Sequence, residues 1–175
     1  SDDFNRGDNE GVGYFDVNQK RGWRWNTAKA FLRPVCMSRP NFTLWTQAQV
    51  SRLQLERDAD GTWRCRGIDA VKDGQRLSAV ATREVILCGG TFNTPQLLML
   101  SGIGPPAELQ RHGIPVRVAL PGVGGNLQDR YEVSVVSEMD FPAWDLYRGA
   151  EFHAGDAAYA RWKSGRGGLY GTNGA

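Results

Sequence analysis

The sequence contains little thiol or imidazole chemistry. Its 175 residues include three cysteines and two histidines. The cysteines, at positions 36, 65 and 88, are far apart and form no CxxC pair, so a zinc site of ordinary spacing and a complete disulfide framework are both excluded. His112 and His153 belong to no HExxH motif, which excludes the common zinc-protease arrangement. Such cysteine usage is typical of a reducing compartment, and we expect the protein to be cytoplasmic or peripheral at a membrane.

An excess of charge and long hydrophobic runs are also missing. Twenty-one Lys and Arg residues balance nineteen Asp and Glu residues, which leaves a net charge of +2 and argues against a nucleic-acid partner. The longest apolar runs, residues 85–88 and 97–100, are far shorter than the roughly 20 residues that a transmembrane helix needs. Since 41% of the residues are hydrophobic, the chain can build one or two domains with a core.

Glycine is abundant, with 22 residues, and it marks turns between predicted elements in the first half. We expect a strand over residues 11–19 and a short helix that Asn26 or Thr27 caps and Pro34 ends. Three further strands are predicted over residues 42–55, 62–71 and 76–81, separated by turns at 58–61 and 72–75. The pattern is that of an antiparallel β-meander.

The second half begins with a pattern typical of a nucleotide-binding βα unit, residues 83–102. The run at residues 85–88 predicts a strand buried on both faces in a parallel sheet, and Gly89 and Gly90 end it. A helix follows, with Thr94 as N-cap, Pro95 as first helical residue and a left-handed glycine at position 102. The remaining predictions are a second helix from residue 106 to Gly113, strands over 115–120 and 131–136, and weak helical character over 144–162. The fold class is therefore α/β.

One glycine-rich segment begins like a dinucleotide fingerprint. Gly122-Val-Gly124 follows a predicted strand, but Leu127 stands where the third glycine belongs, and Pro121 interrupts the junction. We interpret the segment as a structural turn. An NAD-dependent enzyme would need an intact fingerprint.

A long segment of the chain resembles a known family. Residues 90–104, GTFNTPQLLMLSGIG, are similar to the second signature of the glucose–methanol–choline (GMC) oxidoreductases. Further segments follow in the family's order, at residues 3–5, 11–14, 28–32, 83–87, 121–129 and 172–175, and the choline-dehydrogenase-like branch is the most similar. The resemblance implies an internal fragment: residues 1–130 as part of an FAD-binding Rossmann-like domain with an antiparallel insertion, and 131–175 as the start of a substrate-binding domain.

What the resemblance implies is an FAD-dependent enzyme that oxidises an alcohol, choline-like or another primary alcohol, by hydride transfer to the flavin. The implied partners are the alcohol and an external electron acceptor, which would be oxygen, a quinone or another molecule. The family's catalytic histidine has no counterpart here, because neither His112 nor His153 matches its position. We therefore expect no catalytic residue in this chain and no turnover by it alone. A non-catalytic binding or oligomerisation domain is the alternative.

Five residues match cofactor-binding positions of the family. Val50 lies on the predicted strand whose backbone contacts the adenine of FAD, although simple strand core is an equal alternative. Gly89 and Gly90 match the strand end beside the adenosine half, where glycine lets the backbone approach a ligand. Asn93 and Thr94 are expected to begin the next helix, whose free N–H groups can face a polar group.

Glu132 is the candidate substrate-binding residue. In choline-oxidising relatives a glutamate at this place lies against the quaternary ammonium, which a carboxylate beside aromatic rings attracts. The alternative is a solvated strand carboxylate. The family often has histidine where this chain has Arg130, and a cation two residues from Glu132 could neutralise it.

Overall fold

The computed structural model describes residue 11, residues 16–131, residues 133, 138 and 140, and residues 150–171. The chain divides into two compact units, one formed by Ser1–Thr43 with Val135–Ala175 and the other by Leu44–Ser134. The predicted boundary after residue 130 separates an FAD-binding domain from a substrate-binding domain. The division into compact units does not test that assignment, which stays a prediction.

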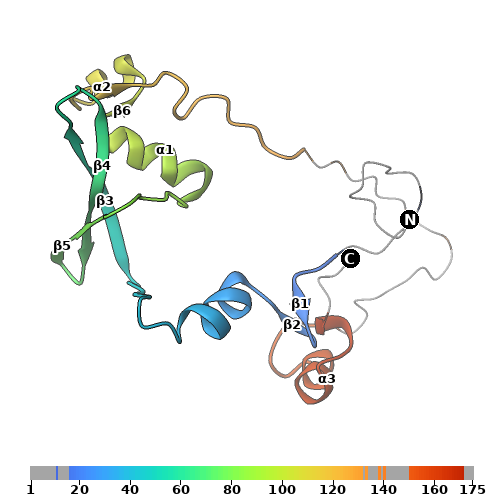
Figure 1. Ribbon diagram of the computed structural model, residues 1–175. Helices are drawn as coiled ribbons and strands as arrows, with labels where there is room; N and C mark the ends of the chain where they lie inside the picture. Colours follow the sequence, from blue (N-terminus) through green and yellow to red (C-terminus); the bar gives the residue numbers. More distant parts are fainter. Residues whose placement is uncertain are drawn as a thin grey trace. The chain divides into compact units, whose positions relative to one another are not determined.

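The Leu44–Ser134 unit is built on a three-stranded antiparallel sheet (Figure 1). Its strands are β3 (Ala48–Arg57), β4 (Trp63–Lys72) and β5 (Gln75–Val80), in the order β3-β4-β5. They lie in the region where the sequence predicts three strands. Gly61 and Gly74 take the left-handed conformation in the two connecting turns, with φ of 85° and 76°, which explains why glycine stands there.

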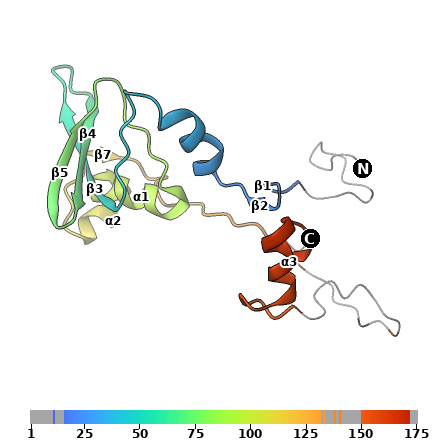
Figure 2. The same ribbon diagram turned by 90° about the horizontal axis from the view of Figure 1, so that it is seen from below.

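Helix α1 (Gly90–Leu100) packs against β3, and both ribbon views place it beside the sheet (Figures 1 and 2). A short parallel pair follows, β6 (Ile103–Gly104) with β7 (Val118–Ala119), joined through α2 (Pro106–Arg111). Leu109 of α2 is 1% exposed. The buried hydrophobic residues of the described part are Leu53, Ala70 and Leu109, so the core is small.

The predicted buried strand at residues 85–88 is wrong. The backbone there forms no strand in the described structure, Ile86 is 73% exposed and Cys88 is also exposed. An apolar run becomes a buried strand only where neighbouring strands supply hydrogen bonds and cover both faces. No backbone hydrogen bond joins residues 85–88 to another described segment.

Two predicted helix boundaries are also corrected. Helix α1 has Gly89 as N-cap, so Thr94 and Pro95 lie inside the helix rather than at its start. Pro34 does not end the helix η2 (Ala28–Cys36), which has π-helical hydrogen bonding and includes it. A proline lacks the N–H donor, so each of these helices continues past a position that cannot donate a backbone hydrogen bond. Thr27 holds the N-cap position of η2 without a side-chain cap bond, whereas the Asn26 Oδ1 accepts from the Lys29 N–H at 3.1 Å.

Other predictions are met in part. The left-handed glycine predicted at position 102 is confirmed, with a φ of 88°, and Gly113, predicted to end the second helix, follows the C-cap of α2 with a φ of 66°. The strand predicted over residues 115–120 is reduced to β7, and β6 was not predicted. The predicted strand over 131–136, most of the one over 11–19, Trp144 and residues 172–175 lie outside the described residues.

The other unit joins segments from both ends of the sequence. A hairpin, β1 (Gln19–Lys20) and β2 (Trp23–Arg24), contacts the helix α3 (Ala157–Gly165). The indole Nε1 of Trp162 donates to the Gly22 carbonyl at 2.7 Å. The Arg166 guanidinium lies over the rings of Trp23 and Trp162, at 4.3 and 4.6 Å from their centroids. Cation–π contacts of this kind stabilise the pairing of segments about 140 residues apart.

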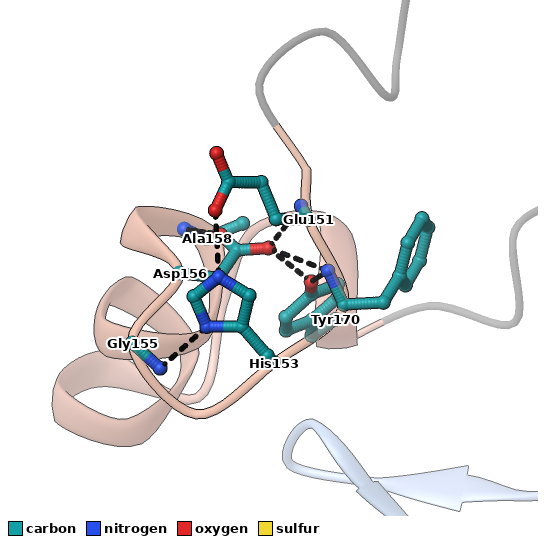
Figure 3. Close-up of polar contacts among 7 residues, drawn as sticks. Glu151, His153, Gly155, Asp156, Ala158 and Tyr170 are labelled. Carbon is teal, nitrogen blue, oxygen red and sulfur yellow. Dashed lines mark hydrogen bonds and ion pairs between the residues drawn. The ribbon is translucent and has the colours of Figure 1, made fainter.

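Asp156 is the polar centre of this unit (Figure 3). It is 3% exposed and caps α3 by accepting from the Ala158 N–H at 2.5 Å. Its other oxygen accepts from the backbone N–H groups of Glu151 and Phe152, at 2.6 and 3.0 Å, and from the Tyr170 hydroxyl. The Tyr170 hydrogen bond is the main cause that holds the pKa of Asp156 well below its usual range, and the backbone donors act in the same direction.

We predict that Asp156→Asn loosens α3, because an amide NH₂ would face N–H donors that now meet a carboxylate oxygen. Amide hydrogen exchange over residues 157–165 at pH 7 should accelerate several-fold. Since a lowered native pKa stabilises only above the unfolded pKa, the wild-type contribution is present above about pH 4 and is lost on further acidification. The variant should lack that acid-dependent step in tryptophan fluorescence.

The matched control is Glu151→Gln, which alters an exposed carboxylate paired with His153 but leaves the Glu151 N–H in place. It should exchange like the wild type. Equal exchange rates for Asp156→Asn and the wild type would contradict the role given to this carboxylate.

Candidate functional site

Four of the five predicted cofactor-binding residues line one cavity. Val50, Gly89, Asn93 and Thr94 come from β3, from the junction before α1 and from the first turns of α1, and they surround a volume of about 560 Å³. This size lies within the usual range of ligand sites, roughly 300–1,000 Å³. The structure therefore brings together residues that are about forty positions apart in the sequence.

The walls of the cavity combine apolar surfaces with amide groups. Apolar side chains come from β4, from the segment before Gly89 and from α1, namely Ile68, Val85, Ile86, Leu87, Leu97 and Leu100. The amide side chains are those of Gln49, Asn93 and Gln96. A flat aromatic base with hydrogen-bonding edges is the kind of ligand that such walls suit, because its faces are apolar and its rim is polar.

Val50 is half-buried in β3, where it is paired with Ala70 of β4. The pairing shifts register between Val50 and Arg52, which marks a bulge in the strand at the cavity. A bulge re-aims backbone groups locally, so the backbone next to Val50 departs from a regular ladder.

Glycine suits the N-cap position of α1, Gly89, and its first residue, Gly90, for different reasons. A Cβ on Gly89 would lie 3.2 Å from Asn93 Cβ and from the Thr94 backbone nitrogen, so close packing against the helix favours glycine there. Gly90 has a φ of 81°, and no atom lies within 4 Å of the Cβ that it lacks. Open space beside a left-handed backbone is what a close ligand approach needs.

Thr94 was predicted to precede α1 as its N-cap, but it acts from inside the helix. Its Oγ1 accepts from the Gly89 N–H at 3.0 Å and so fixes the entry into α1 from within the helix. The first N–H groups of an α-helix have no intrahelical acceptor and carry partial positive charge. The start of α1 at Gly90 therefore presents donors beside the cavity.

Other candidate residues lie apart from this cavity. Glu132 is outside the described residues, so its predicted role stays a prediction. His112 pairs with Glu108 at 3.1 Å and His153 with Glu151 at 2.6 Å; both rings are more than half exposed, and no histidine lines the cavity among the described residues.

Sequence reasoning did not identify the two glutamines that line the cavity, Gln49 and Gln96. It also did not identify Ser101, which is hydrogen-bonded to β3. Gln96 lies three residues after Asn93, a helical spacing that places both on one face and could have revealed it. Gln49 is next to Val50, and strand alternation predicts that its side chain lies on the opposite face, so the sequence pattern gave no signal for it.

Two searches of the described residues limit other chemistries. No group of three side chains that could ligate a metal occurs in the described ranges. None of the helices that the structure describes has the length and apolarity to cross a bilayer.

Comparison with known proteins places the chain in a family. The model of the GMC oxidoreductases matches residues 1–132. The chain belongs to the GMC oxidoreductase family. Among relatives, mouse (Mus musculus) mitochondrial choline dehydrogenase is 50% identical over 135 residues, which are 77% of this chain and 22% of that protein. The resemblance to the choline-dehydrogenase-like branch is thereby confirmed.

Solved structures agree with the family. A formate oxidase crystal structure matches with a TM-score of 0.68 and 33% identity, over 87% of this chain and 26% of that one. An FAD-dependent oxidoreductase from Chaetomium thermophilum matches with a TM-score of 0.58 and 28% identity, over 78% and 23%. Its name agrees with the cofactor that the sequence predicts. The chain thus spans about a quarter of the length of these relatives.

Proposed function

We propose that the protein containing this chain is an FAD-dependent oxidoreductase that oxidises an alcohol, choline or another primary alcohol. The observation that carries the proposal is the convergence of Val50, Gly89, Asn93 and Thr94 on one cavity in a member of the GMC oxidoreductase family. In this proposal residues 1–130 are part of a Rossmann-like FAD domain, with the β3-β4-β5 sheet as its insertion. Residues 131–175 begin the substrate domain.

The cavity supports binding of the adenosine half of FAD. Its apolar walls can cover both faces of an adenine, and the backbone amide and carbonyl near Val50 can pair with its edge. The open space at Gly90 leaves room for the sugar or phosphate beside the start of α1, where the N–H groups favour negative charge.

When bound, FAD supplies the acceptance of a hydride from the carbinol carbon, and an external electron acceptor reoxidises it. The residues of this chain bind and orient the nucleotide. The proposal assigns removal of the hydroxyl proton to the family's catalytic histidine, whose position neither His112 nor His153 matches. Glu132 is the proposed contact for a cationic alcohol.

The direct experiment uses the purified full-length protein. Flavin absorbance at an FAD-to-protein ratio near one, with reduction of an artificial acceptor dye in the presence of choline or a neutral primary alcohol, would support the proposal. A colourless protein that takes up no FAD would overturn it and favour a binding or oligomerisation module.

A matched glycine pair tests the nucleotide site. Gly90→Ala should weaken FAD binding by roughly tenfold or more, because a Cβ enters the space that the ligand needs. A tenfold loss of affinity corresponds to about 1.4 kcal/mol of binding free energy. Gly74→Ala imposes similar backbone strain, since Gly74 has a φ of 76° with nothing within 4 Å, but it lies in the β4–β5 turn. Titration of the apoprotein with FAD measures both, and equal dissociation constants for the two variants would contradict the assignment.

Glu132→Gln tests the substrate contact. Loss of the carboxylate should raise the KM for choline at least several-fold more than the KM for a neutral primary alcohol, because only the cation gains from the negative charge. Glu84→Gln, an exposed carboxylate next to the 85–88 segment, is the control and should change neither value. A similar rise for both alcohols would remove the case for Glu132.

A further inference from the structure

We propose that Ser101 is a positioning residue for the cofactor cavity, which it acts on by joining α1 to β3. The inference rests on the proposed function, because it assigns to Ser101 an effect on FAD affinity. Ser101 does not line the cavity itself, so its effect passes through the two elements that do.

The contact is a buried hydrogen bond between distant segments. Ser101 is 3% exposed, and its hydroxyl oxygen accepts from the backbone N–H of Leu53 at 2.9 Å. The same hydroxyl donates to the Leu97 carbonyl at 2.7 Å, so it acts as donor and acceptor at once. Leu53 is 4% exposed, and water is therefore a poor substitute for this partner.

This bond joins two elements that line the cavity, β3 and the C-terminal end of α1. Leu53 follows Val50 by three residues on β3, and Ser101 follows Leu100, which is a lining residue of α1. β3 is an edge strand, and its pairing with β4 shifts register between Val50 and Arg52 and again between Gln54 and Leu55. The ladder is thus irregular on both sides of Leu53, and the bond to Ser101 supplies a fixed point between them.

The segment that follows Ser101 is closely packed at two glycines. A Cβ on Gly102 would lie 2.6 Å from the Pro115 carbonyl oxygen, and one on Gly104 would lie 2.9 Å from Met99 Cγ. Gly102 also has a φ of 88°. A second contact, from Arg117 Nη1 to the Leu55 carbonyl at 3.1 Å, holds the next stretch of β3.

Removal of the hydroxyl would leave the Leu53 N–H buried without an acceptor. The Leu97 carbonyl keeps a partner, because it also accepts from the Ser101 N–H at 3.1 Å. The strand and the helix can relieve the unpaired donor only by moving apart to admit water, which changes the width of the cavity. The loss should therefore appear in nucleotide affinity.

The experiment compares Ser101→Ala, Ser101→Thr and Ser78→Ala in the full-length protein. Ser78 is a matched control: its hydroxyl accepts from Gln54 Nε2 at 2.7 Å, which joins β5 to β3 on the exposed sheet face without touching α1. The readouts are the FAD dissociation constant of the apoprotein and the kcat per bound flavin.

We expect Ser101→Ala to raise the FAD dissociation constant by roughly tenfold and to leave the kcat per bound flavin within about twofold. Ser101→Thr, which keeps the hydroxyl, and Ser78→Ala should both stay within about threefold of the wild type in FAD affinity. Where Ser101→Ala fails to fold, Ser101→Thr decides: affinity near the wild type supports the proposal, and a tenfold loss overturns it.

An unchanged dissociation constant in Ser101→Ala, or an equal loss in Ser78→Ala, would overturn the positioning role while the wild type still binds FAD. A wild-type protein that binds no FAD would instead overturn the proposed function, and the role of Ser101 with it. The two failures are therefore distinguishable.

Discussion

The packing of helix α1 against the edge strand β3 is the constraint on which the candidate site depends. Val50 and Asn93 are separated by more than forty residues, and they share a cavity because the strand and the helix lie side by side. The cavity is the space between these two elements, with the segment before Gly89 closing another side. Any change that separates strand from helix alters every contact that a ligand there would make.

Polar contacts and close approaches at glycine help to fix this arrangement. The described part buries three hydrophobic side chains, so apolar burial alone gives little control over register. In one unit that control comes from the Ser101 hydroxyl and from two close contacts at glycine, of Gly102 with the Pro115 backbone and of Gly104 with the Met99 side chain. In the other unit the Asp156 carboxylate has the comparable role, since it accepts four hydrogen bonds. In both units a small residue or a buried polar group fixes geometry that a larger core would otherwise fix.

The features that sequence reasoning predicted correctly are the local ones. Gly102 and Gly113 end helices in the left-handed conformation because glycine alone pays no Cβ penalty there. The prediction of a buried strand at residues 85–88 failed because it rested on an apolar run alone. Burial depends on neighbouring strands, which a local pattern does not contain. Thr94 misled because a capping hydroxyl usually precedes its helix, and here it reaches back to Gly89 from inside. The Leu53–Ser101 bond joins residues 48 positions apart, and no local pattern encodes it.

Hydrogen exchange of the full-length apoprotein, with and without FAD, tests the central claim most directly. If the space between β3 and α1 holds the adenosine half of the flavin, FAD should slow exchange in peptides covering residues 48–53 and 89–97. Peptides from the β4–β5 turn, residues 72–75, should be unaffected. Protection confined to other parts of the protein, with residues 48–53 and 89–97 unchanged, would contradict the account.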